Sequence, residues 1–160
     1  MKFKRVKIAQ FQEQDCQLTL AEAIDEFYLL NAHLFAKPSP NNKWSELLVF
    51  HDVGHVFFGV NTTILDEAIG DYWTIFGTDL SIREYLDYAN TPEARKLIKS
   101  IGLLGIIMSL VISLPSLFRV LIRTRKMYAK WPARDYQQYM DIPLRKIRQE
   151  FGLRILQYNE

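Results

Sequence analysis

Two histidines and two carboxylates follow one another at a spacing that suits a metal ion. His51, Asp52 and His55 lie within five residues, and Glu67 follows after eleven more. Successive residues of an α-helix are rotated by about 100°, so the first three share one face. Imidazole nitrogens together with carboxylate oxygens suit Zn²⁺, Fe²⁺ or Mn²⁺. The spacing therefore predicts a metal site, and the same four residues are its candidate catalytic groups.

The main alternative to a metal site is a buried polar cluster without an ion. An isolated histidine on an apolar helix is usually a hydrogen-bonded core residue, and His33 is interpreted as structural or exposed for this reason. Each carboxylate could bind the metal directly or orient an imidazole from behind it. Asp66 and Asp71, near Glu67 in the sequence, are expected at the surface or behind the ligands.

Helix start and stop signals predict how the motif is positioned. Residues 19–22 and 81–84 are capping boxes. Threonines and an asparagine at 61–63 can cap the helix that carries Glu67. Gly59 is placed to end the histidine helix. The following helix can then fold back antiparallel and return Glu67 to the two histidines.

The remaining start and stop signals in the sequence also indicate helices. Pro92 after Thr91 is a strong helix start, and Pro143 opens a last helix that ends near Gly152. No hairpin signal or internal repeat is present. With 160 residues, the chain is predicted to be one all-α domain over residues 1–160. We expect six to eight helices, with an apolar groove or a membrane-contact helix.

Residues 101–118 form an uncharged run of 18 residues, close to the roughly 20 needed to cross a bilayer. Gly105, Ser109 and Ser113 form a ladder of small residues that permits close helix contact, and Pro115 should kink the helix. A buried central helix or a monotopic membrane contact is the favoured interpretation, because the run is short and interrupted. A transmembrane helix is the alternative.

Charge is unevenly distributed although the net charge is only +2. Six basic residues and no acid lie between Arg119 and Arg134. Such a block can face anionic lipid or simply be a solvated helix face. Nucleic acid is not expected as a partner, because no binding motif accompanies the charge. The single cysteine, Cys16, cannot form an internal disulfide, which fits a reducing compartment.

At the metal motif the chain resembles the Coq4 family of ubiquinone (coenzyme Q) biosynthesis proteins. The family signature, His-Asp-x-x-His, eleven residues and then Glu, is matched by His51, Asp52, His55 and Glu67. Within the spacer, the family tends to place a glycine, a threonine and an apolar pair where this chain has Gly59, Thr62, Ile64 and Leu65. Residues 143–152 also look like the family's closing helix. The likeness covers roughly residues 44–153, which form the motif core.

The resemblance implies an all-helical protein that handles polyprenylated hydroxybenzoate-type quinone precursors. The family is associated with replacing the ring carboxyl at C1 by a hydroxyl, a metal-dependent oxidative decarboxylation, and with organising the quinone biosynthetic complex. Carried over, His51, Asp52, His55 and Glu67 would hold a divalent metal, Zn first, with Fe, Mn or Mg as alternatives. A peripheral location is implied, at the cytoplasmic face of a bacterial membrane or at the mitochondrial inner membrane.

The sequence also leads to expectations about partners and about alternative functions. We expect a prenylated precursor or another isoprenoid lipid, a membrane surface, other quinone biosynthesis proteins and a homo-oligomer. One rival is a non-catalytic prenyl-lipid scaffold. The other is a metal-dependent phosphohydrolase, which is weakened because the sequence shows no second histidine pair and no phosphate-binding loop.

Overall fold

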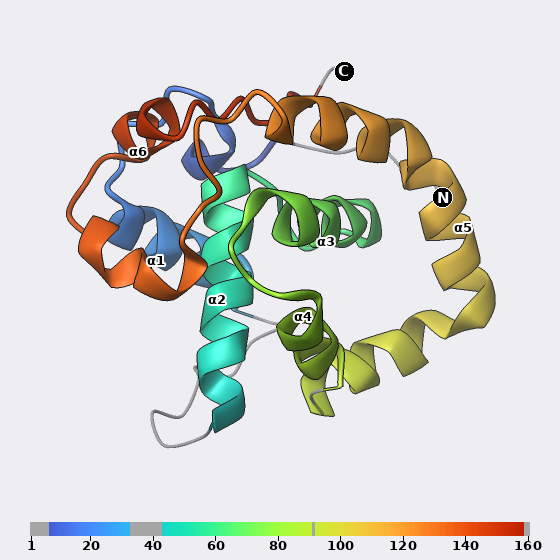
Figure 1. Ribbon diagram of the computed structural model, residues 1–160. Helices are drawn as coiled ribbons and strands as arrows, with labels where there is room; N and C mark the ends of the chain where they lie inside the picture. The colour runs from blue at the N-terminus through green and yellow to red at the C-terminus, as the bar shows by residue number, and fades with distance from the viewer. Residues whose placement is uncertain (1–6, 33–42, 91, 159–160) are drawn as a thin grey trace.

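The computed structural model describes residues 7–32, 43–90 and 92–158, and every regular element in these ranges is a helix (Figure 1). This confirms the all-α class. His33 lies outside the described residues. The elements are η1 (Gln10–Gln12), α1 (Leu20–Leu30), α2 (Lys43–Phe58), α3 (Ile64–Gly77), α4 (Ile82–Ala89), α5 (Pro92–Thr124), η2 (Ala133–Tyr139) and α6 (Leu144–Glu150), where η is a 3-10 helix.

Both predicted capping boxes are confirmed. The Thr19 hydroxyl accepts a bond from the Glu22 backbone N–H at 3.3 Å, and the Glu22 carboxylate accepts one from the Thr19 N–H at 2.8 Å. Ser81 and Glu84 make the same reciprocal pair at 3.3 and 2.8 Å before α4. These bonds satisfy backbone donors that a helix start leaves without partners.

The turn between α2 and α3 brings the two halves of the motif together. Gly59 has a φ of 66°, and a Cβ there would lie 2.8 Å from the Ile155 side chain, so both backbone and space require glycine. Thr63 then caps α3 by accepting a bond from the Asp66 N–H at 3.2 Å. As a result α3 packs against α2, as the sequence predicted.

Aromatic side chains fill the core around the C-terminal end of α2. Phe57 stacks on Trp131 with ring centroids 4.1 Å apart, and Phe58 stacks on Trp73 at 4.9 Å. The fully buried Arg148 of α6 closes this end of α2 by donating to the Val56 and Phe57 carbonyls, both at 2.9 Å. Last-turn carbonyls of α2, which have no partner within the helix, are thereby satisfied.

Helix α5 curves around the side of α3 that faces away from α2 (Figure 1). Its inner face carries the predicted small residues, because Ser113 is bonded to the Tyr72 hydroxyl at 2.7 Å and Ser109 donates to the Ile64 carbonyl at 3.3 Å. The break in α5 lies at Gly102, with φ 72° and ψ 162°, and not at Pro115. Glycine tolerates this left-handed conformation, whereas the proline is accommodated inside the helix.

The outer face of α5 corrects one expectation. Residues Gly102–Thr124 form a helix long and apolar enough to cross a membrane, but few of them are buried in the protein. Leu103 and Leu104 are 75% and 72% exposed. The interpretation as a buried central helix is therefore wrong, because only the small-residue face of α5 packs on α3. A membrane-contact helix fits the observed exposure.

Candidate metal centre

The structure brings three of the four motif residues to one point. His51 and His55 lie one turn apart on α2, and Glu67 projects from the first turn of α3. The two histidine Nε2 atoms are 3.2 Å apart. Glu67 Oε2 lies 3.7 Å from His51 Nε2 and 3.6 Å from His55 Nε2. The three ligand atoms therefore form a nearly equilateral triangle, which could hold a metal ion.

The size of this triangle fits a divalent transition metal. A point equidistant from the three atoms lies about 2.0 Å from each, which is close to zinc's usual bond lengths to imidazole nitrogen and carboxylate oxygen. Three protein ligands leave a fourth position for water or substrate, as in catalytic zinc sites. The same two-histidine, one-carboxylate set with open positions also serves non-haem Fe²⁺.

Asp52 stands behind His51 and not among the ligands. Its Oδ1 lies 3.5 Å from His51 Nδ1, on the opposite edge of the ring from the Nε2 that faces the triangle. Its Oδ2 accepts a bond of 2.8 Å from the Tyr28 hydroxyl. The Oδ1 contact is longer than a hydrogen bond, and this buried oxygen has no hydrogen-bond partner among the described residues. A carboxylate beside the outer ring nitrogen is the usual group that orients a metal-binding imidazole. The structure thus does not bring Asp52 to the triangle, and its place beside His51 corresponds to the orienting alternative that the sequence left open.

An aromatic ring and a glycine border the triangle of ligand atoms on the His55 side. His55 is buried and stacks on Phe27 with ring centroids 5.4 Å apart. Its Nδ1 has no hydrogen-bond partner among the described residues. A Cβ at Gly70 of α3 would lie 3.8 Å from His55 Nε2. The absence of that methyl group leaves space beside the ligand atoms.

Charge coupling across the triangle holds His55 and Glu67 as an ion pair without metal. Burial lowers the pKa of His55, but the Glu67 carboxylate outweighs it and raises this pKa to about 9. Burial raises the pKa of Glu67, but the facing histidines, His55 above all, bring it below its usual value. A divalent cation would replace the shared proton with a larger positive charge between the same atoms.

Two further carboxylates, Asp66 and Asp71, lie near the site, and the sequence predicted both at the surface or behind the ligands. Asp71 lies one turn after Glu67 on α3, is half-buried, and accepts a hydrogen bond from Tyr85 of α4. Burial raises the pKa of Asp71 to about 6, and the charge of Glu67 adds to this effect. Asp66, by contrast, is buried and accepts a 2.9 Å bond from the Thr63 hydroxyl.

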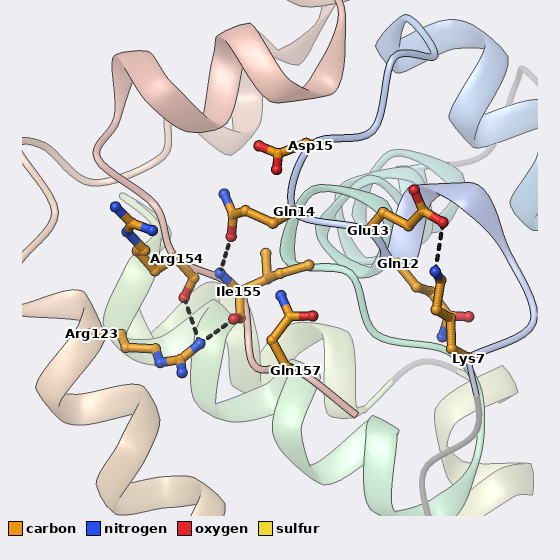
Figure 2. Close-up of a pocket in the computed structure, with 9 residues that line it drawn as sticks. All are labelled: Lys7, Gln12, Glu13, Gln14, Asp15, Arg123, Arg154, Ile155 and Gln157. Atoms are coloured by element: carbon orange, nitrogen blue, oxygen red, sulfur yellow. Dashed lines mark hydrogen bonds and ion pairs between the residues drawn. The ribbon is translucent and has the colours of Figure 1, made fainter. Parts of the chain in front are cut away.

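A different cavity lies where the N-terminal segment meets the end of α5 and the C-terminal segment (Figure 2). Its lining is mostly polar, and none of the triangle residues belongs to it. Arg123, on its wall, donates to the carbonyls of Arg154 and Ile155, and Gln14 accepts a bond from the Ile155 N–H at 2.9 Å. These bonds hold the C-terminal segment in place. Because its lining is mostly polar, the cavity is not the predicted apolar groove.

Comparisons with protein-family models, with curated proteins and with solved structures give no match to this chain. The resemblance to the Coq4 family therefore stays a prediction that depends on the spaced motif. The geometry of the triangle and the exposed apolar helix are the structural features that bear on function.

Proposed function

We propose that the protein binds one divalent metal ion at His51, His55 and Glu67, and that Zn²⁺ is its first candidate. The triangle of ligand atoms, with sides of 3.2 to 3.7 Å, is the observation that carries this proposal. Asp52 orients His51, and Tyr28 in turn holds Asp52. Fe, Mn and Mg are the alternatives, with Mg the weakest because it prefers oxygen ligands and retained water.

The proposed role follows the Coq4 resemblance: a peripheral membrane protein that acts on a prenylated hydroxybenzoate-type quinone precursor. A metal at this site would supply Lewis-acid polarisation of the ring carboxylate or a phenolic oxygen. Loss of the C1 carboxyl as CO₂ with gain of a hydroxyl is an oxidation, so that reaction also requires oxygen and a redox-active metal. Zinc alone would support binding and polarisation but not the oxidative step.

The precursor's prenyl tail needs an apolar environment, and burying it gains about 0.8 kcal/mol per methylene. The exposed apolar side of α5 supports such an environment at a bilayer surface. Partners in this proposal are the prenyl lipid, the membrane and other quinone biosynthesis proteins, with a second copy of the chain as a further candidate. The proposed location is the cytoplasmic face of a bacterial membrane, or the mitochondrial inner membrane.

A non-catalytic scaffold is the second candidate, and restricted access to the triangle favours it. The side chains of His51 and His55 are only 9% and 1% exposed, and Glu67 is 20% exposed. A metal enclosed to this degree could stabilise the packing of α2 on α3 while the protein presents a lipid to partner enzymes.

The testing experiment is native mass spectrometry with metal analysis on protein purified without chelators, followed by organic extraction. One divalent metal per chain, absent from His51→Ala, together with a prenyl lipid is the expected result. Turnover of a prenylated hydroxybenzoate with oxygen to the C1-hydroxylated product would then favour the enzyme over the scaffold. Protein that contains neither metal nor lipid would overturn the proposal, and metal-dependent phosphatase activity would favour a hydrolase.

A further inference from the structure

Helix α5 presents a long apolar face that nothing in the described chain covers. Leu104, Val111 and Phe118 are 72%, 61% and 63% exposed and recur at helical spacing. Between and beside them lie further exposed apolar side chains: Leu103, Ile107, Met108, Leu110, Leu114 and Ile122. A helix of 23 residues, Gly102–Thr124, is about 34 Å long at 1.5 Å per residue. Its length alone would allow it either to cross a bilayer or to lie along one.

The inner face of α5 argues against crossing. It is fastened to α3 through Ser113 and Tyr72 and through Ser109 and the Ile64 carbonyl. If α5 crossed the hydrocarbon, α3 beside it would have to enter as well. Helix α3 carries three carboxylates, Asp66, Glu67 and Asp71. Placing ionisable groups in hydrocarbon is costly, whereas a helix that lies in the surface keeps α3 on the aqueous side.

Charge at the two ends of the apolar segment supports the same orientation. Arg95 and Lys99 precede it and are exposed, while Arg125 and Lys126 follow it and are also exposed. A crossing helix has an excess of basic residues on one side. Basic residues at both ends instead suit a helix whose two ends meet the same anionic surface.

We infer that α5 lies in the plane of a bilayer that contains anionic phospholipid, with its outer face in the acyl region. The basic residues at both ends contact the lipid phosphates. Helix α3 then separates the bilayer from α2, because it packs between α2 and α5. This inference deepens the membrane location in the proposed function but does not depend on the metal, so each can fail without the other.

Binding is tested by flotation with vesicles of phosphatidylcholine alone and with added phosphatidylglycerol. The wild-type protein should float with the mixed vesicles. Leu104→Glu combined with Val111→Glu should weaken binding more than about tenfold, because each change removes an apolar anchor. Leu29→Glu is the matched control, since Leu29 is 79% exposed but lies on α1. All variants should keep the wild-type helix content and metal content.

A second pair of variants tests whether membrane binding requires the basic residues at the end of α5. Arg125→Ser with Lys126→Ser should weaken binding to mixed vesicles on the order of tenfold, at about 1 kcal/mol for each near-surface charge. Arg145→Ser with Lys146→Ser removes the same charge from exposed positions on α6 and should change binding little. Equal losses in the two variants would show a net-charge effect and overturn the assigned contact.

Orientation is tested with a fluorophore on single cysteines introduced by Leu104→Cys, Val111→Cys or Ile122→Cys. The native Cys16 is buried and its pKa is raised by that burial, so it should not compete for label. Lipid quenchers at known depths should place all three labels near the headgroups and the outer acyl chains, with 111 only slightly deeper because α5 is curved (Figure 1). A label at 111 near the centre of the bilayer would indicate crossing and overturn the inference.

Two further results would also overturn it. One is failure of the folded wild-type protein to float with either kind of vesicle. Alternatively, sedimentation could show a dimer that Leu104→Glu with Val111→Glu dissociates, in protein that does not bind vesicles. The second result would identify another copy of this chain as the occupant of the face.

Discussion

Helices α2 and α3 enclose polar side chains inside the protein, whereas α5 turns apolar side chains outward. In the first region His51, His55 and Glu67 face one another with little exposure. In the second, Leu104 and Phe118 are more than half exposed. Both arrangements are unfavourable in water, because buried ionisable groups lose hydration and exposed apolar surface costs about 25 cal/mol per Å².

The difference between the regions indicates two different missing partners. A cation would satisfy the enclosed groups, and a lipid surface would cover the outward ones. Helix α3 belongs to both regions, since Glu67 faces α2 and Tyr72 contacts α5. Variants can therefore test whether each region depends on its own partner, or whether both regions only reflect a fold of low stability.

The strongest test uses Arg148, a buried charge whose hydrogen-bond partners lie within the chain. Arg148→Met should lower the free energy of unfolding by about 3–5 kcal/mol, because the Phe11 and Phe57 carbonyls lose their donor at about 1–3 kcal/mol each and the Val56 carbonyl keeps only the Gly59 N–H. Urea unfolding measures this. Arg145→Met, at an exposed position of the same helix, should change it by less than about 0.5 kcal/mol. A loss below 1 kcal/mol for Arg148→Met would contradict the account.

The next effect concerns the enclosed ligands. His55→Ala or Glu67→Ala should each lower zinc affinity more than about hundredfold, because loss of a direct ligand exceeds the 10–100-fold effect of an outer partner. Competition titration with a chromophoric chelator measures the affinity, and circular dichroism should show unchanged helix content. Asp87→Ala, which removes an exposed acid from α4, is the control. Wild-type stoichiometry in both ligand variants would refute the site.

Substitution of Asp52 tests whether this residue orients His51 or coordinates the metal directly. Asp52→Asn should reduce zinc affinity by about 10–100-fold without abolishing binding, because the carboxylate acts through His51. Tyr28→Phe should have a smaller effect in the same titration, since the tyrosine bonds to Asp52 and is one step further from His51. Loss of zinc from Asp52→Asn as complete as from Glu67→Ala would place Asp52 among the ligands.

The buried side of α5 provides a smaller test. Ser113→Ala removes the hydrogen bond to Tyr72 and should lower the free energy of unfolding by about 1 kcal/mol. Thermal or urea unfolding checks the change, and Ser116→Ala on the same helix is the comparison. The same substitution should leave vesicle binding unchanged if α5 binds lipid through its opposite face. Weaker vesicle binding would show that the two faces are not independent.

The smallest expected effect is the pH dependence of the Glu84 contacts on α4. Bonds from Ser81, and then the ion pair with Arg134, lower the pKa of Glu84 from 4.5 to about 2. A lowered pKa means that the contribution to stability is present above pH 4.5 and is lost as the pH falls toward 2. Glu84→Gln should therefore be less stable than wild type by under about 1 kcal/mol at neutral pH. Unfolding curves of the two proteins should converge near pH 2, and a constant difference would contradict the assignment.

Local signals predicted much of this structure. The capping boxes, the positive φ of Gly59 and the cap of α3 each depend on residues only a few positions apart. The approach of Glu67 to the histidines follows from two helices and one tight turn, so the spacing of the motif was sufficient to predict it. These features need no knowledge of distant contacts.

What the sequence could not provide depends on long-range packing. Whether Asp52 binds a metal or orients His51 is decided by the rotation of one side chain toward Tyr28 of another helix. The exposure of α5 depends on which of its faces α3 occupies. Its break lies at Gly102 and not at Pro115, since Gly102 is the residue whose φ and ψ leave the helical range. The interior position of Arg148 likewise follows from segments far apart in the chain.

The bonds of Arg148 also affect the order in which the protein can fold during its synthesis. They join α6 to the Phe11 carbonyl near the N-terminus and to the end of α2. The start of α1 also depends on a segment far along the chain, because the Leu20 N–H donates to the Ile142 carbonyl at 3.0 Å. The ribosome makes these partners 92 to 137 residues apart. Helices α1 and α2 must therefore wait, incompletely packed, until residue 148 has left the exit tunnel, and chaperones can bind the growing chain during that interval.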